Sequence, residues 1–424
     1  MNESTIYLNQ IFTKFDKKKD GIFFSPPEII KILFEKVVSY VVSYINNDLK
    51  HVKDILEPAC GSCEFVDYLQ NNGFEHSNID CIEYNKTIYN TISKVIRKNV
   101  KYTYSDFLHY DIESNKKYDL IIGNPPYFVI SLKNIPFHFI GKTEEEKYFE
   151  GRPQIFILFL FHALHKLKEN GILAFVLPKN IMNSHYYKKM RKYIDQNYHL
   201  LELIDFSNIP FLDTTQETIG IIIQNKKIDK SDSINKYNFI IDNNFIWTFY
   251  KNELVSLYKD ATSLHMLGFS VKTGTITWNE HKSKLTCDTK KTLLIYNTNI
   301  EQNKLVIKEF KNEEKKQFIE IDGKSEPLPI IVCNRGHGNS KYKMNFCYID
   351  EKMIKNMNIQ SVIIENHLNI IYHKTACYED KVVMMKKIAT QLGNTEKVQK
   401  WCNLFLGNNG FSKTELEYYF PIYN

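Results

Sequence analysis

The sequence predicts an α/β protein with a doubly wound, mostly parallel sheet, followed by a second domain of mixed α and β structure. Short apolar runs alternate with stretches of helical spacing through the first 225 or so of the 424 residues. A polar, charged stretch at Lys226–Lys236 then separates this first part of the chain from a second part, in which the apolar pattern is less regular. We therefore expect one domain at residues 1–228 and another at residues 229–424.

The first part begins with apolar residues at helical spacing over residues 28–46. Apolar runs of strand length and further helical patterns then alternate. In the first part we expect strands at 52–57, 79–83, 118–123, 171–177, 200–206 and 218–224, and helices at 64–70, 88–97, 155–168 and 186–196. In the second part we expect strands at 292–296, 328–333, 362–365 and 368–372, and helices near 380–391 and 396–406.

The composition is that of a soluble protein, with 43% apolar and 25% charged residues. No stretch reaches 18 uninterrupted apolar residues, and the start of the chain lacks a basic region followed by an apolar one. These observations predict a cytoplasmic protein without a membrane partner. Residues 1–225 contain 26 basic and 27 acidic residues, whereas residues 226–424 contain 29 and 22. The second part is therefore modestly basic, which suits either a polyanion-binding face or an ordinary solvated surface.

Eight cysteines are scattered along the chain, and we expect them to be free thiols. Cys60 and Cys63 form a Cys-x-x-Cys pair, but no second pair or histidine follows at ligand spacing. The sequence therefore predicts no metal site.

A glycine-containing loop, Glu57–Cys63, follows the first predicted strand. Ligands of open α/β sheets bind at the carboxyl ends of strands, and Gly61 would let the backbone approach a ligand closely. The loop is neither a dinucleotide fingerprint nor a phosphate-binding loop. Glu83 ends the second strand 22 residues after Gly61, a spacing that suits binding of ribose hydroxyls.

The tetrapeptide Asn124–Tyr127 reads Asn-Pro-Pro-Tyr and follows the apolar run of residues 118–123. The two prolines stiffen the turn, Asn124 offers a carbonyl acceptor, and Tyr127 offers a flat aromatic face. Such a turn suits a planar group with an exocyclic amine, although a tight turn with a packed tyrosine gives the same four residues.

These motifs resemble S-adenosylmethionine-dependent amino-methyltransferases, specifically gamma-class DNA N6-adenine methyltransferases. Gly21–Pro27 is similar to the family's N-terminal Gly-x-x-Tyr/Phe-Thr/Ser-Pro element, and Glu57–Cys63 to its Asp/Glu-Pro-x-x-Gly-x-Gly loop, with Cys63 in place of a glycine. The resemblance implies a Rossmann-like seven-stranded sheet with a C-terminal DNA target-recognition domain. It implies S-adenosyl-L-methionine as the cofactor, contacted by Ser25, Pro26, Glu57, Pro58, Ala59, Gly61, Glu83, Tyr84, Asp106, Phe107 and Asn124.

The resemblance also implies how the transfer would run. The oxygen Oδ1 of Asn124 and the carbonyl of Pro125 would accept the two hydrogens of an adenine amine, while Pro126 keeps the turn rigid. The adenine would be flipped out of double-stranded DNA and stacked between Tyr127 and, by position, Phe211. The loop at residues 128–152 would contact the duplex or cover the pocket.

Recognition of the DNA sequence falls to the second domain in this interpretation. Arg335 and His337 are candidates for base contacts, and Lys272, Lys282 and Lys284 for phosphate contacts, with ordinary surface positions as the alternative for each. We expect a monomer, cytoplasmic and associated with the nucleoid or with a host compartment, with a separate restriction endonuclease as a candidate partner.

Other activities suit the same motifs. Protein glutamine-N5 methyltransferases share the Asn-Pro-Pro-Tyr sequence, and RNA N6-adenine and DNA N4-cytosine methylation use the same chemistry. A cofactor-binding protein without activity is a further alternative. C5-cytosine methylation is excluded, because it needs a Pro-Cys nucleophile and the chain has no such dipeptide.

Overall fold

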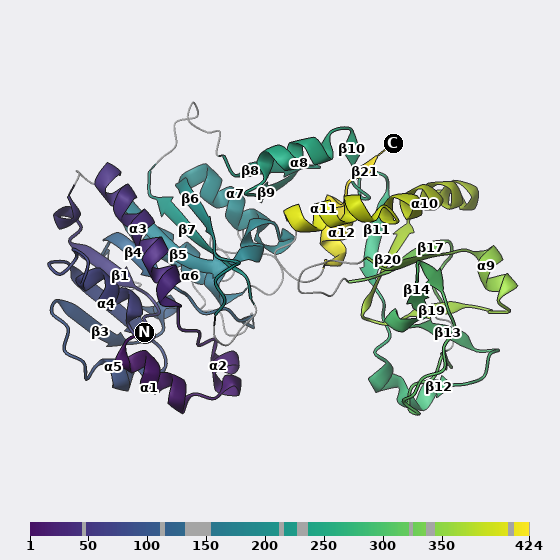
Figure 1. The fold of residues 1–424 in the computed structure, drawn as a ribbon, viewed down its shortest axis with the longest axis horizontal. Helices are drawn as coiled ribbons and strands as arrows, with labels where there is room; N and C mark the ends of the chain where they lie inside the picture. The colour runs from purple at the N-terminus through teal and green to yellow at the C-terminus, as the bar shows by residue number, and fades with distance from the viewer. Residues whose placement is uncertain are drawn as a thin grey trace. The chain divides into compact units, whose positions relative to one another are not determined.

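The structure is a computed structural model, which describes residues 1–44, 48–110, 115–131, 154–211, 216–226, 236–321, 325–335, 344–405 and 411–423. The chain divides into two compact units (Figure 1). The first comprises residues 1–239 and 245–249, and the second comprises residues 240–244 and 250–424. The boundary expected at residues 228 and 229 lies outside the described residues.

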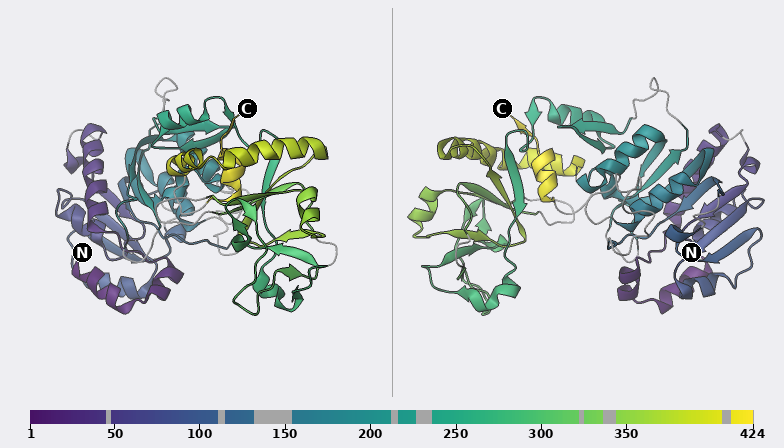
Figure 2. Two further views of the ribbon diagram at one scale, coloured as in Figure 1. Left: turned by 45° about the vertical axis from the view of Figure 1, so that its right-hand side comes forward. Right: turned by 180° about the vertical axis from the view of Figure 1, so that it is seen from behind.

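The first unit is built on a seven-stranded sheet with the order β3-β2-β1-β4-β5-β7-β6 (Figures 1 and 2). All neighbouring strands are parallel except β7, which runs antiparallel to both β5 and β6. The strands are β1 (Asp54–Glu57), β2 (Asn78–Glu83), β3 (Val100–Tyr104), β4 (Tyr118–Gly123), β5 (Leu167–Pro178), β6 (His199–Asp205) and β7 (Thr218–Gln224). The doubly wound α/β fold is confirmed.

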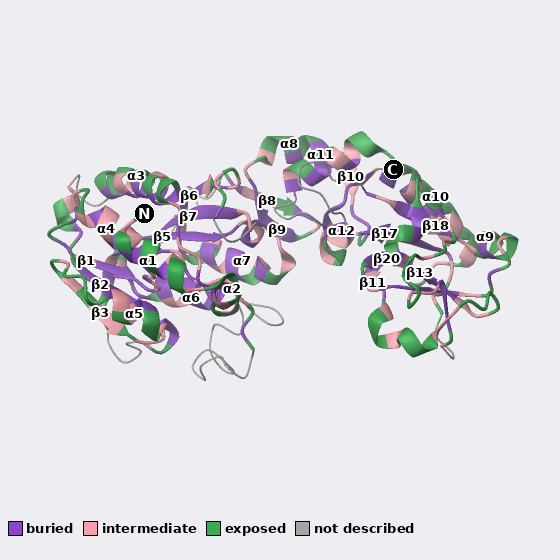
Figure 3. Ribbon diagram, turned by 60° about the horizontal axis from the view of Figure 1, so that its bottom comes forward, coloured by how far each residue is buried: buried purple, intermediate pink, exposed green. Residues whose placement is uncertain are grey.

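Helices cover both faces of this sheet, because successive residues of a buried strand point to opposite sides. In β4, Leu120 and Ile122 join a core with α3, α4 and α5, whereas Ile121 joins a core with α6 and α7. The central strands are accordingly buried along nearly their whole length (Figure 3). The helices are α1 (Glu3–Ile11), α2 (Lys14–Asp20), α3 (Pro27–Tyr44), α4 (Glu64–Gln70), α5 (Lys86–Ile92), α6 (Ile155–His165) and α7 (Lys188–Asn197).

Strand β3 is not among the strands that the sequence predicts. Its sequence is Val-Lys-Tyr-Thr-Tyr, and none of its residues is fully buried, because it lies at the edge of the sheet and pairs only with β2. The long apolar pattern at residues 155–168 is a helix only as far as His165. Leu167 already pairs with Tyr118 as the first residue of β5.

The second unit contains two small four-stranded sheets, with the orders β11-β20-β17-β18 and β12-β16-β13-β19. Its strands are β10 (Ala261–Thr262), β11 (Phe269–Thr273), β12 (Leu285–Thr286), β13 (Thr292–Ile295), β14 (Ile300–Glu301), β15 (Lys304–Leu305), β16 (Phe318–Ile319), β17 (Ile330–Asn334), β18 (Phe346–Ile349), β19 (Val362–Ile364), β20 (Leu368–His373) and β21 (Ile422–Tyr423). Its helices are α8 (Lys251–Tyr258), α9 (Glu351–Asn356), α10 (Tyr378–Leu392), α11 (Thr395–Phe405) and α12 (Lys413–Tyr419). The chain enters this unit through the hairpin of β8 (Asn238–Ile241) and β9 (Asn244–Trp247). Within the described residues, no helix has the length and apolar character needed to cross a membrane.

Candidate active site

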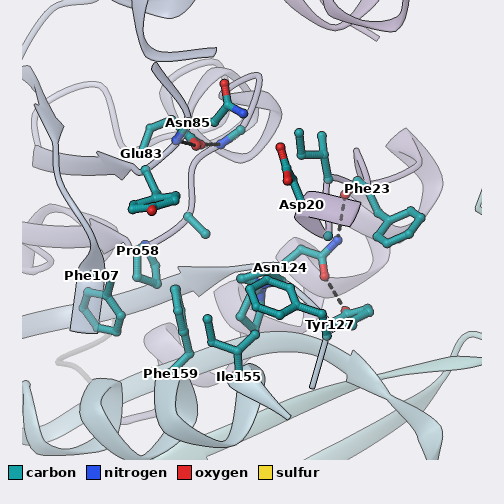
Figure 4. Close-up of a pocket in the computed structure, with 18 of the residues that line it drawn as sticks. Asp20, Phe23, Pro58, Glu83, Asn85, Phe107, Asn124, Tyr127, Ile155 and Phe159 are labelled. Atoms are coloured by element: carbon teal, nitrogen blue, oxygen red, sulfur yellow. Dashed lines mark hydrogen bonds between the residues drawn. The ribbon is translucent and has the colours of Figure 1, made fainter. Parts of the chain in front are cut away.

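A cavity of about 440 Å³ opens at the carboxyl edge of the sheet, beside the ends of β1, β2 and β4 (Figure 4). This volume lies within the range of small-molecule sites. The predicted residues that line the cavity are Pro58, Ala59, Gly61, Glu83, Tyr84, Asp106, Phe107, Asn124, Pro125, Pro126 and Tyr127. Segments far apart in the sequence, from Asp20 to Phe159, therefore meet at one site, as expected for loops at the same edge of a parallel sheet.

The loop after β1 and the end of β2 are joined through Glu83. The backbone N–H of Gly61 donates to Oε2 of Glu83 over 3.0 Å, and the N–H of Asn85 donates to Oε1 over 2.7 Å. Gly61 has a φ of +50°, a conformation that glycine adopts readily. Glu83 is 8% exposed, and burial raises its pKa to about 7 despite the two backbone donors. Its carboxylate keeps lone pairs for further donors such as ribose hydroxyls.

The residues that follow β3 add an acidic side chain, Asp106, and an aromatic side chain, Phe107, to the lining of the cavity. Oδ1 of Asp106 accepts the N–H of Leu108 over 2.9 Å and caps a short 3-10 turn at Phe107–His109. Phe107 is buried, with its ring 5.0 Å from that of Phe159 on α6. Tyr84 is 73% exposed, so its ring is available to a planar ligand.

The side-chain amide of Asn124 is held by the segment after α2. Its Nδ2 donates to the backbone oxygen of Phe23 over 3.2 Å (Figure 4). It also donates to Oγ of Ser25 over 3.1 Å. Because the backbone oxygen of Phe23 can only accept a hydrogen bond, it specifies that the NH2 end of the amide faces this segment. The remaining end, Oδ1, is therefore an oriented hydrogen-bond acceptor.

Tyr127 places its hydroxyl, as well as its ring, beside Asn124. The hydroxyl donates to Oδ1 of Asn124 and lies 2.7 Å from the carbonyl oxygen of Val176 on β5. The ring packs edge-on against Phe156, with centroids 6.1 Å apart, and burial raises the pKa of Tyr127. The sequence predicts a ring face next to the acceptor, whereas the hydroxyl contact depends on packing that the sequence does not reveal.

The N-terminal segment has a further role as a wall of the cavity. Gly21 ends α2 with a φ of +67°, and a Cβ atom there would lie 2.8 Å from the ring of Phe128 and 3.3 Å from Pro126. Only glycine fits both the conformation and the space. Residues that sequence reasoning missed as cavity lining are Asp20, Gly21, Ile22, Phe23, Phe24, Asn85, Ile88, Ser105, Phe128, Ile130, Ile155 and Phe159. The Gly21–Pro27 motif was a signal for Gly21, Ile22, Phe23 and Phe24.

Some predicted residues do not line the cavity. Ser25 and Pro26 are not among its lining residues, and Ser25 is connected to the site by its hydrogen bond with Asn124. Glu57 is 2% exposed, and its Oε2 has no hydrogen-bond partner among the described residues. Burial raises the pKa of Glu57 well above the ordinary value.

Phe211, the predicted second stacking residue, also lies away from the cavity. It is 5% exposed and packs in the core on the α3 face of the sheet, whereas Tyr127 packs on the α6 face. The structure therefore does not bring Phe211 to Tyr127.

The predicted DNA-contacting residues belong to the second unit. Nη2 of Arg335 donates to Oγ1 of Thr273 over 3.2 Å, and Nζ of Lys272 forms an ion pair of 2.6 Å with Glu326. Lys282 pairs similarly with Glu314, and Lys284 lies at the end of the 3-10 segment Trp278–Lys284. His337 and most of the loop at residues 128–152 lie outside the described residues. A DNA-contacting role for these residues stays a prediction.

Comparison with known proteins adds evolutionary evidence to this geometry. Residues 32–211 match the model of the Eco57I restriction-modification methylase family. The chain is 30% identical over 226 residues to modification methylase CviBIII of Paramecium bursaria Chlorella virus NC1A, covering 52% of this chain and 54% of that protein. It is 24% identical over 418 residues to type II methyltransferase M.CvrRI of Paramecium bursaria Chlorella virus XZ-6E, covering 97% and 96%. It is also 31% identical over 136 residues to a tRNA1(Val) (adenine(37)-N6)-methyltransferase of Haemophilus influenzae (strain ATCC 51907 / DSM 11121 / KW20 / Rd), covering 31% and 56%.

Proposed function

We propose that this chain, which belongs through residues 32–211 to the Eco57I restriction-modification methylase family, is a site-specific DNA methyltransferase that modifies N6 of adenine. The observation that carries the proposal is the oriented amide of Asn124, whose Oδ1 points away from the two acceptors that fix its Nδ2. An exocyclic amine is the substrate group that such an acceptor selects.

The cofactor of the family is S-adenosyl-L-methionine, and the residues of the cavity fit it. Glu83 presents a buried carboxylate that suits the ribose hydroxyls, and Tyr84 with Phe107 can enclose a purine. When bound, the cofactor supplies a sulfonium methyl group.

The residues of the Asn-Pro-Pro-Tyr turn prepare the substrate amine for attack. The lone pair of an adenine amine is delocalised into the ring, so the nitrogen is a poor nucleophile. In this proposal Oδ1 of Asn124 and the carbonyl of Pro125 accept its two hydrogens and draw the nitrogen toward a tetrahedral form. A carbonyl oxygen has two lone pairs, so Oδ1 can accept from the Tyr127 hydroxyl and from the amine together. The proton leaves after transfer, and no general base is assigned.

Two relatives favour the chosen substrate. The M.CvrRI methyltransferase aligns along nearly all of this chain, including its second unit, and it is a type II methyltransferase. The Haemophilus influenzae relative modifies an adenine at N6, which supports adenine over cytosine. In duplex DNA the amine lies within a base pair, so the base must flip out to reach Asn124.

The test is product analysis with isotope-labelled cofactor. The purified chain is incubated with unmethylated duplex DNA and, separately, with total tRNA, and the nucleosides are separated by mass spectrometry. We expect label in N6-methyldeoxyadenosine from DNA alone, at one short sequence when the same DNA is sequenced with modified-base detection. Label in N4-methyldeoxycytidine would overturn the choice of adenine, and label confined to tRNA would overturn the choice of DNA.

A further inference from the structure

Three cysteine side chains meet beneath the cofactor loop. Cys60 and Cys63 come from the loop itself, and Cys81 comes from β2. Their Sγ atoms all lie within 4.8 Å of one another, and the three residues are 3%, 0% and 1% exposed. The parallel pairing of β1 with β2, together with a 3.0 Å hydrogen bond from the N–H of Cys60 to the oxygen of Ile82, brings them together.

The backbone at Cys63 is unusual for a residue with a side chain. Cys63 precedes α4 with a φ of 63° and a ψ of 28°, which is the left-handed region. For a residue with a Cβ atom this conformation is less favourable than the right-handed one. Glycine would avoid this cost. The chain therefore places a thiol where a residue without a side chain would fit more easily, and strained residues of this kind cluster at functional sites.

A positive charge lies close to the cluster, since the guanidinium of Arg97 acts electrostatically on the thiol of Cys63. Arg97 is itself fixed by an ion pair with Asp67 and by a 2.7 Å hydrogen bond to the hydroxyl of Tyr102. A thiolate is the form of cysteine that binds metals.

We propose that Cys60, Cys63 and Cys81 form a three-sulfur site for a soft, thiophilic metal ion, with Cu⁺ as the fitting ion. Soft thiolate ligands select ions of this kind. Structural Zn²⁺ sites take four ligands, whereas the group formed by the described residues has three members. The site is distinct from the cavity but adjoins it, because Gly61 lies between two of its ligands and Glu83 follows the third by two residues.

The test is a Cu⁺ titration of the full chain under anaerobic, reducing conditions against a competing chelator. Cys287 and Cys377 are exposed, so both are first replaced by serine to remove surface thiols. In that background we compare the unaltered cluster, Cys81→Ser, and Cys402→Ser as a control that removes a buried thiol from α11. Thermal melting of the metal-free proteins identifies any variant that fails to fold.

We expect one Cu⁺ ion per chain for the unaltered cluster and for the Cys402→Ser control. Cys81→Ser should weaken binding more than about 100-fold, since loss of even an outer-sphere partner of a metal ligand costs about 10- to 100-fold. X-ray absorption of the loaded, unaltered cluster should show three sulfur neighbours around copper, a readout that does not depend on how well a variant folds. Equal affinity of a folded Cys81→Ser variant, or a copper ion with fewer than three sulfur neighbours, would overturn the proposal.

Discussion

The two ends of the cavity fix their functional groups in different ways. At the cofactor end, Glu83 accepts backbone N–H groups from Gly61 and Asn85, which lie on loops next to its own strand. At the transfer end, Asn124 is fixed by Phe23 and Ser25, about 100 residues earlier in the chain. In the proposed function, cofactor binding therefore rests on local loops of the sheet, whereas methyl transfer depends on two hydrogen bonds made across the fold. Substitutions at the two ends should therefore affect different measured constants.

The largest expected effect comes from Asn124→Ala. Loss of the oriented acceptor should lower kcat about 10²- to 10³-fold, by analogy with removal of one preorganised hydrogen-bonding group from an active site. The dissociation constant for S-adenosyl-L-methionine, measured by calorimetry, should stay near the wild-type value. Asn78→Ala, an exposed position at the opposite end of β2, is the matched control and should change neither constant. A large loss of cofactor affinity in Asn124→Ala would contradict the separation of the two ends.

The second-largest effect is expected from Glu83→Gln, at the cofactor end of the cavity. Loss of a charged hydrogen-bond partner worth about 1.5–3 kcal/mol should weaken cofactor binding roughly 10- to 100-fold. Glu75→Gln, at an exposed position, is the control. If Glu83→Gln instead lowered kcat without changing cofactor affinity, the division of labour between the ends would be wrong.

The raised pKa of Glu83 predicts the pH dependence of the same constant. The pKa is about 7 and the carboxylate is the binding form, so protonation below pH 7 should weaken cofactor binding. The dissociation constant should rise about tenfold for each pH unit below 7 and level off above it. Calorimetry between pH 5.5 and 8.5, values chosen to be roughly 1.5 units either side of that pKa, measures this slope. Glu83→Gln should flatten it, and an unchanged slope in that variant would assign the titration to another group.

A smaller effect is expected from Ser25→Ala, which removes one of the two acceptors of the Asn124 amide. A hydrogen bond of this kind contributes about 0.5–1.5 kcal/mol, so kcat should fall by up to about tenfold. The affinity of the Ser25→Ala variant for the cofactor tells whether Ser25 positions Asn124 or contacts the cofactor directly. A role through Asn124 leaves the affinity unchanged, whereas weaker binding would show that Ser25 contacts the cofactor. Ser39→Ala, at an exposed position of α3, is the control.

The smallest effect should come from Tyr127→Phe. The ring, and with it any stacking on the substrate base, is retained, and Oδ1 of Asn124 loses only its tyrosine donor. We expect kcat within about threefold of wild type and a melting temperature lower by about 2–4 °C, from loss of a net hydrogen bond of about 1 kcal/mol. Tyr127→Ala, which removes the ring, should lower kcat far more. Equal losses in the two variants would assign the role of Tyr127 to its hydroxyl.

Sequence patterns predicted the central strands of the first unit because these strands are buried on both faces and read as continuous apolar runs. The edge strand β3 has no such run, and only its pairing with β2 defines it. In the second unit several strands have only two residues, such as β12 and β14, which is too short for a periodic pattern.

Some features of the candidate site could likewise be predicted from the sequence, and others could not. Gly61, Glu83 and Asn124 are visible in the sequence because each belongs to a motif at the end of a strand. The contacts of the Asn124 amide and the approach of Cys81 to the Cys-x-x-Cys pair depend on packing between distant segments. Position along the chain suggested Phe211 as a partner for Tyr127, whereas the structure packs Phe211 in the core on the other face of the sheet.

The proline that follows Asn124 also protects this amide from chemical ageing. Asparagine deamidates mainly when the next backbone nitrogen loses its hydrogen and attacks the side-chain carbonyl, and the nitrogen of Pro125 carries no hydrogen. Asn170, in contrast, precedes Gly171, the neighbour that hinders this cyclisation least. A stored preparation should therefore acquire aspartate at other asparagines while Asn124 keeps its side-chain nitrogen.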